Sequence, residues 1–135
     1  MAARLWAALS LVAAAAVGCG AAMHPGDGVV RFEDGEPVRA GGVELRALDG
    51  GAQYAGRIGR EGGFTLSSLE GKPGVPMGEY EAVVVLVVVT EHLAAHKHVH
   101  GRDVPKRYFS YDTSDLRVDV PSTDAGPIEL EIQSE

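Results

Sequence analysis

A run of seven branched apolar side chains at residues 83–89, Val-Val-Val-Leu-Val-Val-Val, restricts the fold of this chain more than any other feature. Branched side chains of this kind favour a strand over a helix. Successive strand residues point to opposite faces, so an unbroken apolar run indicates a strand that is covered on both sides. The run is also shorter than the roughly 9–11 residues with which a strand crosses a bilayer. The sequence therefore predicts a layered β-structure built around this segment.

Shorter apolar stretches, several of them alternating with polar residues, lie before and after this run, separated by turn residues at intervals of roughly ten. Glycine and proline, 18 and 7 of 135 residues, supply those turns and argue against a long helical bundle. The fold class predicted is all-β, a seven-stranded antiparallel sandwich of immunoglobulin-like size. A hairpin about residues 59–62 is expected to join two of the strands, with Tyr54, Ile58, Phe64 and Leu66 pointing inward. The seven predicted strands are residues 28–32, 43–48, 53–58, 63–67, 83–89, 116–120 and 127–132.

The first residues have the pattern of a targeting segment. Arg4 is followed by 13 uncharged residues, 5–17, which is the length of a signal-peptide core and short for a membrane-spanning helix of roughly 20. Small residues then precede the single cysteine, in the order Ala16-Val17-Gly18-Cys19. This ending resembles the lipobox of bacterial lipoproteins, with Ala16 where leucine is usual. The alternative is ordinary secretory cleavage near Ala22, which would leave a freely soluble protein.

The lipobox resemblance implies a cleaved signal peptide at residues 1–18 and a covalent lipid on Cys19. Several acyl chains would give stable attachment to the membrane. Residues 19–27 are then expected to form a tether in which nothing is buried and His24 is exposed. Gly20 stands where an aspartate would resemble an inner-membrane retention signal. We therefore expect the protein in the cell envelope, on the outer membrane facing the periplasm.

Residues 28–135 form the expected domain, and its motifs resemble a known family. The patterns Gly28-x-Val-x-Phe32, Gly62-Gly-Phe-Thr-Leu66 and Pro76-x-Gly-x-Tyr80 look like the carboxypeptidase regulatory-like, transthyretin-like β-sandwich. Val104-Pro-Lys-Arg-Tyr108 is similar to small bacterial lipoproteins that carry one such domain. The resemblance covers about residues 28–132. It implies an extracytoplasmic module without catalytic activity.

A loop at about residues 91–101 holds four of the five histidines, at positions 92, 96, 98 and 100. Neutral imidazole is a common ligand of Zn, Cu and Ni. His92 and His96 would share a helix face, whereas His96, His98 and His100 would share a strand face, so no regular structure presents all four. Glu91 precedes His92, and the metalloprotease motif His-Glu-x-x-His therefore fails. The alternatives are a solvated loop, a metal site at His92, His96, His98 and His100, and a pH-responsive contact.

Other features narrow the function further. A net charge of −7 has the wrong sign for binding nucleic acid, and one cysteine excludes an internal disulfide. No nucleophile motif or phosphate loop is present, so we expect no enzyme. Tyr108, Phe109 and Tyr111 either form a ligand platform or pack the long loop against the sandwich. The sequence thus predicts a membrane-anchored, non-catalytic binding or structural module with an unknown protein or envelope partner; the alternative is a periplasmic Zn-, Cu- or Ni-binding protein.

Overall fold

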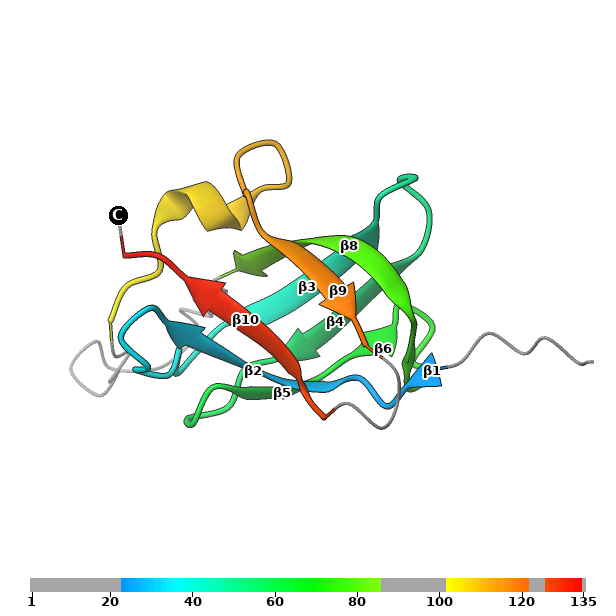
Figure 1. The fold of residues 1–135 in the computed structure, drawn as a ribbon, viewed down its shortest axis with the longest axis horizontal. Helices are drawn as coiled ribbons and strands as arrows, with labels where there is room; N and C mark the ends of the chain where they lie inside the picture. The colour runs from blue at the N-terminus through cyan, green and yellow to red at the C-terminus, as the bar shows by residue number, and fades with distance from the viewer. Residues whose placement is uncertain (1–22, 86–101, 122–125, 135) are drawn as a thin grey trace, which may run out of the picture.

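Three β-sheets and a short 3-10 helix make up the part of the chain that the computed structural model describes, residues 23–85, 102–121 and 126–134. Two larger sheets, of five and three strands, face each other across one core, and a third pairs two short strands at one end (Figure 1). The predicted all-β class is confirmed. In sheet order, the five-stranded sheet is β6 (Ser67–Ser68), β4 (Gln53–Arg57), β3 (Gly42–Ala47), β8 (Gly78–Val85) and β9 (Arg117–Val120); the three-stranded sheet is β10 (Ile128–Ile132), β2 (Asp27–Phe32) and β5 (Gly63–Thr65); the small sheet is β1 (Met23–His24) and β7 (Val75–Pro76); and the 3-10 helix is η2 (Lys106–Phe109).

Alternation along the strands places the core where the sequence predicts it. In β10, Ile128, Leu130 and Ile132 are buried while the glutamates between them are exposed. The same period-two pattern buries Val43 and Leu45 of β3. The expected inward residues are confirmed as members of the core cluster, namely Tyr54, Ile58, Phe64 and Leu66.

Strand β8 is covered on both faces, as the apolar run predicts for its described part. Ala82 and Val84 belong to the core cluster. Val83 lies on the other face and is only 2% exposed, and η2 packs against this strand (Figure 1). The remainder of the predicted strand, residues 86–89, lies outside the described residues.

Two predicted pairings are wrong. The turn at residues 59–62 exists, with Gly62 N–H donating to Gly59 O at 3.0 Å, but β4 and β5 do not form a hairpin. Instead β4 pairs with β3 and β6, while β5 pairs with β2 in the opposite sheet. The sandwich is also not wholly antiparallel, because β2 and β10 run parallel from the pair Gly28 and Ile128 to the pair Phe32 and Ile132. A turn sequence specifies the local reversal and not the sheet that the next strand joins.

The expected tether is partly a strand. Met23 and His24 form β1, which pairs antiparallel with β7. His24 is 1% exposed, so the prediction of an exposed histidine on a segment that buries nothing is wrong. Burial follows a period of two from His24 through Gly26 and Gly28 into β2, and the first two lie before the predicted strand. The folded part of the chain therefore begins no later than Met23.

Candidate functional site

His24 joins β1 to Gly126, which lies just before the last strand, β10. The Gly26 amide donates to Nδ1 at 2.9 Å, and Nε2 lies 2.8 Å from the carbonyl oxygen of Gly126. Since an amide only donates and a carbonyl only accepts, Nε2 carries the ring proton and Nδ1 is the acceptor. Both ring nitrogens are used in structural hydrogen bonds. The sequence holds no apolar alternation at residues 24–28 that could have revealed this role.

The residues that the sequence singles out for lipid and metal lie elsewhere in the chain. Cys19, His92, His96, His98 and His100 are all outside the described residues. Within residues 23–85, 102–121 and 126–134, no three His, Cys, Asp or Glu side chains are grouped to hold a metal ion. In that same part of the chain, no helix has the length and apolar character needed to cross a membrane.

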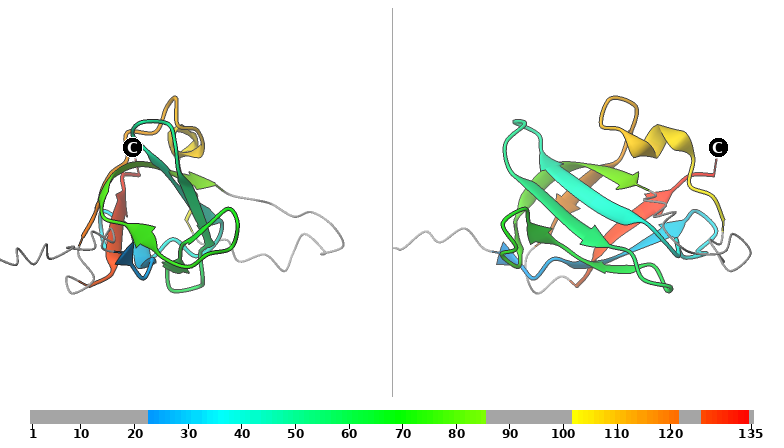
Figure 2. Two further views of the ribbon diagram at one scale, coloured as in Figure 1. Left: turned by 90° about the vertical axis from the view of Figure 1, so that its right-hand side faces the viewer. Right: turned by 180° about the vertical axis from the view of Figure 1, so that it is seen from behind.

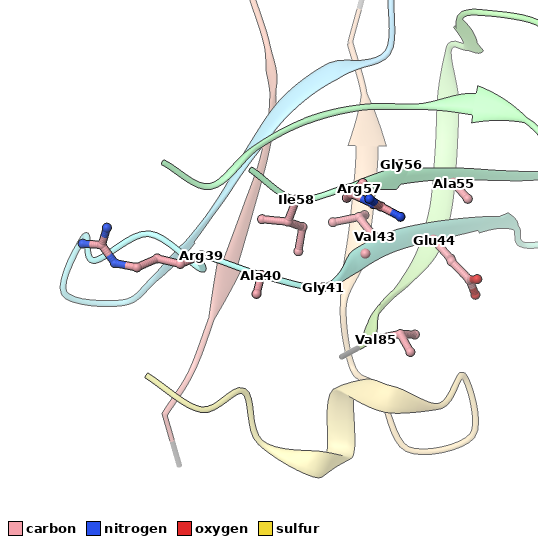
Figure 3. A pocket seen from close by; sticks show the side chains of 11 residues that line it. Arg39, Ala40, Gly41, Val43, Glu44, Ala55, Gly56, Arg57, Ile58 and Val85 are labelled. Carbon is pink, nitrogen blue, oxygen red and sulfur yellow. The ribbon is translucent and has the colours of Figure 1, made fainter. Parts of the chain in front are cut away.

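An open hollow of about 590 Å³ lies over the start of β3 and the end of β4 (Figure 3). Its polar side chains are those of Arg39, Glu44 and Arg57, and Val85 at the end of β8 lies on its border. The Arg39 side chain extends away from the other labelled residues in Figure 3. Within the described part of the chain, Arg57 has no ion-pair partner. The hollow thus offers a partner one cation and one carboxylate beside exposed backbone.

Arg102, the first residue of the described segment 102–121, holds that segment to the turn that follows β2. Its Nη1 lies 2.6 Å from Asp34 Oδ2 and 3.6 Å from Glu36 Oε2, and its guanidinium carbon lies 4.5 Å from the centroid of the Phe32 ring. A hydrogen bond from the Glu36 amide and then the Arg102 guanidinium hold the pKa of Asp34 below its ordinary value. Ser134 near the carboxyl end also contacts this guanidinium. The cluster joins three parts of the chain, and the one guanidinium of Arg102 faces three carboxylates, those of Glu33, Asp34 and Glu36.

The aromatic residues around η2 pack rather than form a platform. Tyr108 is 1% exposed, and its hydroxyl accepts from the Gln133 amide at 3.0 Å. Phe109 is partly buried against the core cluster. The Tyr111 ring lies under the Arg46 guanidinium, 4.0 Å from ring centroid to carbon, and burial raises the pKa of Tyr111 to about 12. Of the two alternatives stated for these residues, the structure shows packing.

Comparison with known proteins identifies no relative of this chain. No family model, curated protein or solved structure matches the chain.

Proposed function

We propose that the chain is a membrane-anchored extracytoplasmic lipoprotein whose β-sandwich is a non-catalytic binding or structural module. The observation that carries the proposal is the place of Cys19. It follows an apolar leader and small residues, and the first strand, β1, begins only four positions later at Met23. All the described structure therefore follows the proposed lipidation site. A signal peptide of residues 1–18 can be removed without taking any of it away.

The domain type proposed is transthyretin-like. The described residues hold ten strands, in two larger sheets that face each other and one small sheet, an arrangement consistent with a β-sandwich. The motif glycine Gly62 also supports this type. Its φ is +84°, and a Cβ at this position would lie 2.5 Å from Val30 O, so there is no room for a side chain. The fold type alone does not specify a function.

A non-catalytic role is supported by the state of the groups that most often perform chemistry. His24 uses both ring nitrogens to hold the backbone. The Ser114 hydroxyl is buried and donates to Ala82 O at 2.6 Å. The Tyr80 hydroxyl donates to Pro76 O at 2.8 Å. Each of these groups is committed to a structural bond in the part of the chain that the structure describes.

Metabolic labelling with a fatty acid tests the anchor. The full chain, expressed in a Gram-negative host, should incorporate the label and sediment with outer membranes on a density gradient. The Cys19→Ser variant should lose the label and the sedimentation. Processed wild-type protein that carries no lipid and stays soluble would contradict the proposal and indicate cleavage near Ala22.

The open hollow is the surface on which we would look for a partner. A photo-crosslinking residue at Arg57 should capture the partner in the envelope, whereas the same residue at Glu129, on the exposed face of β10, serves as the matched control. Equal capture at both positions would show that the hollow is not the contact surface.

The density of histidines at residues 92–100 supports one second candidate, a periplasmic Zn-, Cu- or Ni-binding protein. Calorimetric titration of residues 20–135 with each metal would then give submicromolar, one-to-one binding. Alanine at His96, His98 and His100 together should abolish it. Weak binding without a fixed stoichiometry, or binding unchanged in the triple variant, would contradict this candidate.

A further inference from the structure

The exposed large apolar side chains of the described residues gather at one end of the sandwich. They are Met23 at 44%, Leu48 at 50%, Leu69 at 71% and Met77 at 47% exposure. Single exposed apolar residues are ordinary on protein surfaces. Four that share one end of the molecule are a candidate interaction surface. We name this group of four side chains the apolar end.

Strand pairing places the four residues at the same end of the sandwich. Leu69 directly follows Ser68, which pairs with Tyr54 near the start of β4. Met23 pairs with Pro76, and Met77 is the next residue along the chain. Leu48 directly follows Ala47, which pairs with Tyr80 near the start of β8, so the β3–β4 turn lies at the same end as residue 77. Figure 2 shows that turn, the loop after β6 and strand β1 at one end of the molecule.

The opposite end has a different character. The turn after β2 carries Glu33, Asp34 and Glu36, and the turn between β4 and β5 carries Arg60 and Glu61. These side chains are charged, and none of the four exposed apolar residues lies among them. The two ends of the sandwich therefore suit different surroundings.

The apolar end is also the end nearest the proposed lipid. Pairing of β1 with β7 and the two hydrogen bonds of His24 fix the chain from Met23 onward. Cys19 lies four positions before Met23, and four extended residues span at most about 14 Å. A lipid on Cys19 would thus hold the apolar end within about that distance of the headgroups.

We propose that the apolar end is a membrane-contact surface, on which Met23, Leu69 and Met77 rest in the headgroup region of the bilayer. The inference depends on the proposed lipidation of Cys19. The sandwich then stands with the turn after β2 and the turn between β4 and β5 away from the membrane. Because Asp49 and Glu70 in the neighbouring turns and Glu79 at the start of β8 outnumber Lys72, the contact favours zwitterionic over anionic lipid.

Single cysteines report the contact in the mature lipoprotein. The lipid occupies the thiol of Cys19, the only cysteine in the chain, so an introduced cysteine is the one site for a fluorescent label. We would label Met77→Cys and Leu69→Cys with an environment-sensitive dye and reconstitute each protein in phosphatidylcholine vesicles. Glu61→Cys, at the charged end, is the matched control.

Labels at positions 69 and 77 should shift their emission to shorter wavelength and lose intensity with brominated lipid, and the label at 61 should do neither. A protein that floats with the vesicles while all three labels remain in water would overturn the contact and leave the anchor intact. A protein without lipid that does not float would overturn both. Stronger quenching as anionic lipid is added would also overturn the apolar contact.

Discussion

Replacing His24 with phenylalanine isolates the two hydrogen bonds that hold the first strand. Phenylalanine keeps an aromatic ring of similar size at a position that is 1% exposed, but it has no ring nitrogen. The Gly26 amide then loses its acceptor, and the Gly126 carbonyl loses its donor. Gly26 is buried whereas Gly126 is exposed, so water replaces the lost partner only at Gly126.

The two losses therefore differ in size. A buried amide without a partner costs about 1–3 kcal/mol, and a hydrogen bond that water replaces contributes about 0.5–1.5 kcal/mol. Together they predict that His24→Phe lowers the free energy of unfolding by about 3 kcal/mol. For a domain of this size, that corresponds to a fall in Tm of roughly 10 °C or more.

Urea unfolding of residues 20–135 measures the change, with Met23→Ser as a control at the exposed neighbouring position. Hydrogen exchange gives a local readout, because the Gly26 amide should exchange faster in His24→Phe. A loss below about 0.5 kcal/mol, together with an unchanged exchange rate at Gly26, would refute the assigned role of the imidazole.

Three further predictions concern the packing of the sandwich. Ser114→Ala removes a buried donor from a carbonyl of β8 and should lower stability by about 1–3 kcal/mol in urea unfolding; an unchanged midpoint would show that the bond contributes nothing. Gly56→Ala places a Cβ 2.3 Å from a carbonyl oxygen of β5 and should cost about 1–3 kcal/mol, whereas Gly59→Ala, with 3.6 Å of room, should be nearly neutral; equal effects would contradict the close approach. Burial raises the pKa of Tyr80 and of Tyr111 from 10.0 to about 12, so their contribution to stability is complete below pH 10 and disappears as the pH rises to 12. Absorbance titration should show this late ionisation, and Tyr111→Phe should remove part of it; a single phase near pH 10 would contradict the burial.

Most of the fold could be predicted because one face of each long strand is buried. Alternation in β3 and β10 identifies both the strand and its inward face, as Leu45 and Leu130 illustrate. The apolar run likewise identifies β8 as a strand covered on both sides, shown by Val83 and Val84. These are local signals, and each one appears within a few residues of sequence.

Pairing between distant strands gives no such signal. Residues 53–58 and 63–67 look like the two strands of a hairpin, but β5 belongs to the other sheet. Residue 56 is a glycine because the carbonyl group of Thr65 in β5 lies close to it. Strand β1 has two residues, too few to show a period. Arg102 finds its carboxylates almost 70 positions away, at Asp34, and only the folded chain brings them together. The lipid and metal predictions fall outside the described residues and stay predictions.

The parallel pairing of β2 with β10 determines when the sandwich can be completed during synthesis. Gly28 and Ile128 are direct partners although 100 positions separate them, so the contact order of the three-stranded sheet is high. Until residue 132 is available, β2 has beside it only the three residues of β5 and the bridge from Arg31 to Pro37. A nascent chain that stops before β10 would expose one edge of β2 along its whole length. Closure of this sheet is accordingly a late step of folding, and loss of the last strand should leave a chain that is prone to association.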